Sequence, residues 1–231
     1  MPPQLDRAEL AKRFRNQGND LVVQVASLMQ GGILSAAAFS LIEILRTPGD
    51  VVVRLMLWLM SVGVAFFIFF RLVQRAPLLV RAGGDVLFMV PVMGLLETML
   101  FAILATNTLG PGGWRYWYVA ATLFAAAGFL ATWLNLRALE RTQYADDAEF
   151  VFHAYRATLR RVCVESIVLT GFTGALAVWI LAMPSNWPYF VAFVSIHAVI
   201  VSITGVFGAR GEGRDTDSLR QKLNVWSASD S

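Results

Sequence analysis

Residues 51–70 read VVVRLMLWLMSVGVAFFIFF, and Arg54 is the one charged side chain among these 20 positions. A helix needs about 20 mostly apolar residues to cross about 30 Å of hydrocarbon. The stretch is apolar on every face instead of alternating between apolar and polar, which argues against the strand of a membrane barrel. Residues 51–70 are therefore predicted to form a transmembrane helix.

Five further windows of the same kind lie on either side of this one. The six predicted spans cover residues 21–42, 51–70, 86–105, 117–135, 162–183 and 188–207. At about 1.5 Å of rise per residue, each window is long enough to cross the bilayer with a modest tilt. We therefore expect an all-α membrane protein with six transmembrane helices.

The composition of the whole chain agrees with this fold class. Of its 231 residues, 57% are hydrophobic and 15% are charged. Soluble domains average about 45–50% apolar and about 25% charged residues. The sparse charge excludes a disordered chain, and the single cysteine, Cys163, excludes a disulfide scaffold.

The basic residues predict the orientation of the bundle. Sixteen of the nineteen lysines and arginines fall on one side, and the other side holds only Arg46, Arg54 and Arg115. Because basic residues gather on the cytoplasmic side, both termini and the long loop at 136–161 are predicted to be cytoplasmic. Seventeen arginines against two lysines indicate a GC-rich bacterial genome, and hence a bacterial inner membrane.

Turn sequences on the outer side join the spans in pairs. Clusters of glycine, proline and short polar residues, which end helices, lie at 47–50, 110–113 and 184–188. The sequence thus predicts three antiparallel hairpins. Four tryptophans close to these turns are expected to keep their indole N–H groups in water at the outer boundary, and these are Trp114, Trp117, Trp179 and Trp187.

The long loop carries signals of its own helix. Asp146 and Glu149 have the spacing of a capping box, in which each side chain would accept a hydrogen bond from the backbone near the helix start. Val151, Tyr155 and Leu159 then recur at helical spacing. One helix is predicted from about residue 147 into the fifth span, extending about 20 Å into the cytoplasm.

Two amphipathic segments flank the bundle. The chain divides into an N-terminal segment at 1–20, the bundle at 21–208 and a tail at 209–231. Leu10 and Phe14 lie among basic residues in the first, and Leu219, Leu223 and Trp226 lie beside Arg220 and Lys222 in the tail. Each segment either lies on an anionic membrane surface or forms a solvated helix.

Two ionisable residues, Glu97 and His197, fall near the middle of the third and sixth spans. Such a group in hydrocarbon costs several kcal/mol unless it is neutral, paired or facing water. If the two helices are neighbours, the carboxyl and imidazole groups could share a proton in a relay. Pro91 predicts a kink in the third span, and Thr204 shares a helix face with His197. In the alternative, both residues only hydrogen-bond neighbouring helices.

The basic residues at the cytoplasmic helix ends are expected to bind anionic phospholipid, and they are Arg71, Arg75, Arg81, Arg156, Arg160 and Arg161. Glu165 lies four positions after Arg161, which predicts an ion pair. Nucleic acid is not expected as a partner, because the net charge is only +3 and a basic band is normal for this topology.

The sequence provides little for catalysis. Two histidines and one cysteine do not make a common zinc, haem or iron–sulfur site. The glycine motifs that bind nucleotides follow a strand, and no strand is predicted. We therefore expect no enzyme, no metal site and no cofactor.

Two functions stay open on these grounds. In the first, the chain is a small transport or channel protein that moves protons or a small ion or solute past Glu97 and His197. In the second, it is a non-transporting subunit that scaffolds a larger membrane complex. A transporter should gather several polar residues on one cavity, whereas a scaffold should leave the two residues on separate packed faces. A pore with two polar groups also favours a homo-oligomer or other membrane subunits as partners.

The predicted topology is testable with reporter fusions. A reporter inserted at Gly112 and one fused after Ser231 should lie in opposite compartments, because an odd number of spans would separate them. Paired alkaline phosphatase and fluorescent protein activities measure this directly. Signals from one common compartment would rule out the six-span arrangement.

Overall fold

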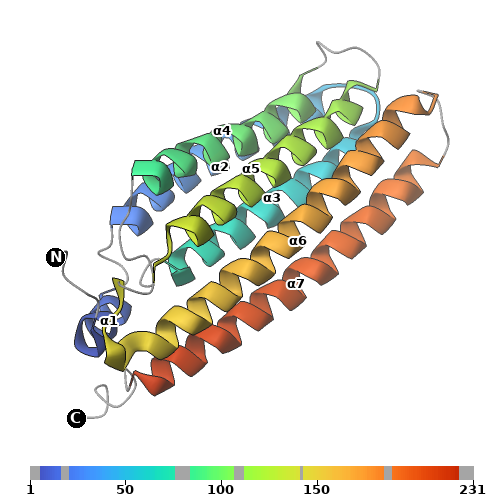
Figure 1. The fold of residues 1–231 in the computed structure, drawn as a ribbon. Helices are drawn as coiled ribbons and strands as arrows, with labels where there is room; N and C mark the ends of the chain where they lie inside the picture. The colour runs from blue at the N-terminus through green and yellow to red at the C-terminus, as the bar shows by residue number, and fades with distance from the viewer. Residues whose placement is uncertain are drawn as a thin grey trace.

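The computed structural model describes residues 6–16, 21–75, 84–106, 112–140, 143–184 and 189–223, and the regular elements among them are all helical. They are α1 (Arg7–Arg15), α2 (Leu21–Arg46), α3 (Val51–Arg75), α4 (Gly84–Ala105), η3 (Gly113–Arg115), α5 (Tyr116–Ala138), η5 (Asp146–Ala148), α6 (Glu149–Ala182) and α7 (Phe190–Lys222). Helices α2 to α7 run alongside one another in one elongated bundle, and α1 lies at the end where α6 begins and α7 finishes (Figure 1).

Within the described residues, four helices are long and apolar enough to cross a membrane. They cover Val23–Arg46, Val51–Arg75, Gly113–Ala138 and Asp146–Ala182, and shorter apolar stretches lie at Pro91–Ala105 and Phe190–Val201. These lengths and compositions fit a multi-pass integral membrane protein. Helix α4 continues through Pro91 without a break.

The order of the helices in space differs from their order in the chain. Helix α2 packs against α3 and α4, α4 packs against α5, and α5 packs against α6. Helix α7 packs chiefly on α3, although it follows α6 directly in the chain, and its packing against α6 is sparse. The first predicted turn lies between α2 and α3, where Gly49 and Asp50 have φ angles of 93° and 52°.

One end of the bundle, where α2 meets α3 and α4 meets α5, is densely packed with aromatic side chains. Trp114 meets Phe190 edge to face, with ring centroids 4.9 Å apart. The Trp114 indole N–H donates to the Asp50 carboxylate at 3.1 Å, and that of Trp117 donates to the Ser61 hydroxyl at 2.9 Å. The expectation that these two indoles point to water is therefore wrong, because polar groups on α3 and the turn before it accept from them. Trp187 lies outside the described residues.

Arg54, which the sequence assigns to the outer side, is not exposed there. Its side chain is buried, with 4% of its surface exposed, and its guanidinium donates to the backbone carbonyl of Leu104. That carbonyl lies in the last turn of α4, where backbone acceptors lack helical partners and a cation is favoured. Arg46, by contrast, is exposed and forms an ion pair with Glu43 at 3.4 Å.

The opposite end of the bundle is closed by a small helical cap. The predicted helix into the fifth span is present as α6, which is continuous over 34 residues. Its apolar stripe of Val151, Tyr155 and Leu159 is buried, as predicted. Leu10 of α1 and two residues at the end of α7, Leu219 and Leu223, pack against this stripe.

The two amphipathic segments therefore bury their leucines on α6, instead of on a membrane surface or in solvent. The side chains of Phe14 and Trp226 lie outside the described residues. The cap is dry enough that burial raises the pKa of the Tyr144 hydroxyl above its ordinary value. These contacts link both ends of the chain to the start of α6.

The predicted capping box at the start of this helix is wrong. The chain enters α6 through the 3-10 turn η5, and neither element receives a hydrogen bond from a capping side chain. The residues at the two N-cap positions are Ala145 and Ala148, and their side chains have no hydrogen-bond acceptor. A capping box would need Asp146 at the N-cap position and Glu149 three residues later, and Asp146 is not at that position. Asp147 instead accepts from the backbone N–H of Arg7 at 3.3 Å, which fastens α1 to the cap.

Substituting Tyr155 with aspartate should destabilise the protein, because it places a charge in the centre of the buried stripe. The free energy of unfolding should fall by at least about 2 kcal/mol. Thermal unfolding in a fixed detergent measures this change. The control is Ala157→Asp, which adds the same charge at an exposed position of α6; equal effects of both variants would contradict the packed cap.

Candidate functional site

A cavity of about 1630 Å³ lies between α3, α5, α6 and α7. Its walls are mostly apolar, and small residues on two helices leave the space open. Ala121, Ala125 and Gly128 line it from α5, and Gly205 and Gly208 line it from α7. A Cβ atom added at Gly205 would meet no atom within 4 Å, so the backbone of α7 borders free space there.

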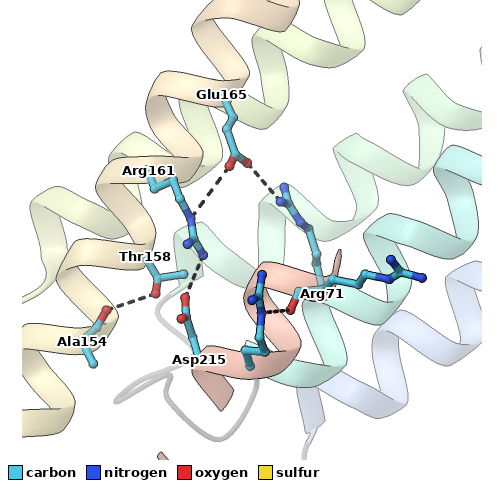
Figure 2. A network of polar contacts seen from close by, with 8 residues as sticks. Arg71, Ala154, Thr158, Arg161, Glu165 and Asp215 are labelled. Atoms are coloured by element: carbon cyan, nitrogen blue, oxygen red, sulfur yellow. Dashed lines mark hydrogen bonds and ion pairs between the residues drawn. The ribbon is translucent and has the colours of Figure 1, made fainter. Parts of the chain in front are cut away.

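An ion network lies at the end of the cavity near the helical cap. Arg71 of α3 donates to Glu165 of α6 at 3.0 Å, and Arg161 lies 3.8 Å from the same carboxylate. Arg161 also donates to Asp215 of α7 at 2.8 Å. Figure 2 shows these four side chains converging from the three helices. The predicted ion pair between Arg161 and Glu165 is confirmed, and it belongs to a larger network.

His197 lies at the other end of the cavity. It is 3% exposed and lines the cavity, and its Nδ1 atom is 3.2 Å from the hydroxyl of Tyr118. The two rings stack with centroids 5.4 Å apart, and the Phe172 ring meets the imidazole edge to face. The Nε2 atom is buried and has no hydrogen-bond partner among the described residues. It is therefore available to a ligand or a water molecule in the cavity.

Glu97 lies on α4 between Met93 and Leu100, two residues of the same helix face that line the cavity. It is 3% exposed, its Oε1 atom is buried without a hydrogen-bond partner in the described part of the chain, and it is not among the residues that line the cavity. Its helix α4 packs mainly against α2 and α5, whereas the helix of His197 packs on α3. The described residues include no hydrogen bond or ion pair between the two side chains, so the structure does not bring Glu97 and His197 together as a pair.

The other predicted site residues are divided between the cavity and its surroundings. Arg71, Arg75 and Arg161 line the cavity, whereas Arg156 and Arg160 are exposed on α6. Pro91 lies inside α4, and Arg81 and the side chain of Thr204 lie outside the described residues.

Sequence reasoning assigned no role to two buried polar residues. Tyr118 holds the imidazole of His197, and no motif in the sequence links these positions. Gln30 is a buried amide on α2 whose Nε2 atom has no partner among the described residues. Its place among apolar residues at the spacing of Ala26, Ile33 and Ala37 is a signal that could have identified it as buried.

Neither metal chemistry nor known relatives point to a function. Among the described residues, no group of three or more histidine, cysteine, aspartate or glutamate side chains could hold a metal ion. Comparison with family models, curated proteins and solved structures gives no match for this chain. The functional argument therefore depends on the geometry of the cavity.

The unpartnered carboxyl group of Glu97 leads to a stability prediction. Glu97→Leu keeps a similar shape and removes a buried polar group without a partner, so it should stabilise the protein by about 1 kcal/mol. Glu97→Gln keeps a polar group there and should leave the stability nearly unchanged. Thermal unfolding in one detergent compares the variants. A loss of about 1–2 kcal/mol in Glu97→Leu would instead reveal an interhelical hydrogen bond.

Proposed function

We propose that this chain is a membrane transport protein whose pathway is the cavity between α3, α5, α6 and α7. One observation carries the proposal: the bundle is densely packed at one end and hollow at the other, with a buried histidine where the two parts meet. A pathway that is open on one side and closed on the other is what alternating access requires.

The closed end is formed by large side chains from several helices. Trp114, Trp117, Tyr118, Ile180 and Phe190 belong to one buried cluster there. At the other end, the cavity reaches the arginines of the ion network. In the proposed topology this arginine end is cytoplasmic, so the described state faces the cytoplasm.

The lining supports an organic substrate over a bare ion. Polar residues gather on this one cavity, as expected of a transporter, and they include Thr132, Asn135, Thr173 and His197. Yet most of the wall is apolar, whereas ion pathways are lined by carbonyl or charged groups. We therefore propose that an organic molecule uses the cavity, and that His197 exchanges the proton in any coupled step.

The proposal includes six spans, three hairpins and cytoplasmic termini in a bacterial inner membrane. Two spans beyond the four long apolar helices would come from α4 and α7, which have 22 and 33 residues. Both are long enough at about 1.5 Å per residue. The same proposal assigns no enzymatic reaction to the chain.

The scaffold remains the competing function, and the position of Glu97 favours it. This residue is buried and does not itself line the cavity, as expected of a polar contact inside a non-transporting subunit. Homo-oligomers or other membrane subunits would then cover the apolar outer faces of the bundle.

Cysteine labelling from the two sides of the membrane separates these functions. The variant Ala198→Cys, in a Cys163→Ser background, places a thiol in the cavity beside His197. A transporter that alternates should let a membrane-impermeant maleimide reach this thiol from each side of oriented vesicles. Mass spectrometry measures the labelled fraction.

The matched control is Ala37→Cys in the same background. Ala37 is buried between α2 and its neighbours and does not line the cavity, so its thiol should stay unlabelled. Labelling of Ala198→Cys from the cytoplasmic side alone, or from neither side, would overturn the transport function in favour of the scaffold.

A further inference from the structure

We propose that the cavity binds an anionic phospholipid of the cytoplasmic leaflet, with its head group at the arginine end and its acyl chains between α6 and α7. This inference rests on the proposed function and names the chemical class of its substrate. It depends on the size, the side opening and the charge of the cavity.

The size of the cavity fits a lipid better than a small polar solute. Its volume of about 1630 Å³ exceeds the roughly 300–1,000 Å³ of sites for drug-sized ligands. A Cβ atom at Gly208 would lie 3.1 Å from the guanidinium of Arg71, so Gly208 marks the level of the ion network. From position 208 back to His197, α7 rises about 16 Å. This depth is about half of the roughly 30 Å hydrocarbon core, and the acyl chains of one leaflet fill about that half.

The cavity opens sideways, through the slot between α6 and α7. Val164 and Val168 on α6 and Ile200 on α7 line the cavity, yet they are 61%, 64% and 43% exposed. These side chains thus face both the cavity and the outer surface of the bundle. The described residues of these two helices pack only sparsely against each other. An acyl chain can enter through such a slot directly from the bilayer.

The charge at the arginine end selects an anionic head group. Arg71, Arg75 and Arg161 line the cavity there together with one carboxylate, Glu165. Three guanidinium groups and one carboxylate are thus the charged groups that line this end among the described residues, and Asp215 is the second partner of Arg161. Guanidinium groups bind phosphate oxygens in a two-point geometry, and the carboxylates of the network orient two of them. A lipid head with a net negative charge is therefore favoured over a zwitterionic one.

The test uses the full-length protein in detergent and native mass spectrometry. Palmitoyl-oleoyl phosphatidylglycerol and phosphatidylcholine, which differ in head group alone, are added at equal concentration. We expect the protein to retain phosphatidylglycerol about tenfold over phosphatidylcholine. Arg75→Gln should lower this preference about fivefold, because it removes one lining charge. Arg137→Gln, at an exposed arginine that stacks on Trp133 outside the cavity, should keep it.

Filling the cavity tests the position of the acyl chains. Gly205→Phe and Gly63→Phe place a ring in free space on two different walls, and each should abolish lipid retention. Gly171→Phe adds the same ring on an exposed face of α6 outside the cavity and should retain the lipid. Using two walls keeps the test valid if one variant fails to fold. Retention by both cavity variants at the level of Gly171→Phe would overturn the proposal, as would equal retention of the two lipids.

The outcome is separable from that of the cysteine labelling. Selective lipid retention combined with labelling from one side alone supports the lipid site and overturns transport. Labelling from both sides without lipid retention overturns the lipid site and leaves the pathway to another organic solute.

Discussion

The ion network of Arg71, Glu165, Arg161 and Asp215 joins α6 to two helices on which it otherwise packs only sparsely. Glu165 accepts a hydrogen bond from Arg71 and forms an ion pair with Arg161, which offsets the repulsion between the two guanidinium groups. Because the network lies at the end of the cavity, the separation of α6 from α3 and α7 depends on it. The helical cap beyond the network also holds α6 and α7 together, because Leu219 and Leu223 pack on α6 there.

The width of the cavity has a second cause in the small residues of α5 and α7. In membranes such residues usually let two helices approach closely. Gly174 of α6 does come close to α5, because a Cβ added there would lie 3.5 Å from Thr122. Ala125, Gly128 and Gly205, however, line the cavity. Small residues therefore have two effects on α5. On one face they let α6 approach closely, and on another face, where no helix approaches, they leave open space.

The sequence predicted the helices well because each had to satisfy its backbone hydrogen bonds within a long apolar segment. It also predicted the continuous α6 and its buried Tyr155, since the stripe has a clear helical period. The partners of single polar groups were not predictable. Trp114 and Arg54 both bond to groups on other elements, Asp50 and the carbonyl of Leu104. Local sequence contains no information about which element supplies such a partner.

The sequence was sufficient to identify the two buried ionisable residues, but not to predict whether their side chains contact each other. Glu97 and His197 were identified because ionisable residues are rare in apolar windows, and both are buried. Whether they meet depends on which helices are neighbours. Every apolar window can pack on every other, since lipid and leucine are equally apolar. The structure has α4 mainly against α2 and α5 and has α7 mainly against α3, so Glu97 and His197 lie on helices with different main neighbours.

A cavity of this size also limits what the protein can be in a membrane. The space of about 1630 Å³ is not an enclosed void, because exposed side chains of α6 and α7 line it and open it to the outer surface of the bundle. Water or lipid from the surroundings can therefore enter the space, and the chemistry of the lining selects between them. Water needs two to four polar partners per molecule, and a mostly apolar wall provides few of them. Hydrocarbon reaches the cavity through the slot between α6 and α7 and needs no such partners. An acyl chain is therefore the occupant that lets the hollow half of this bundle exist.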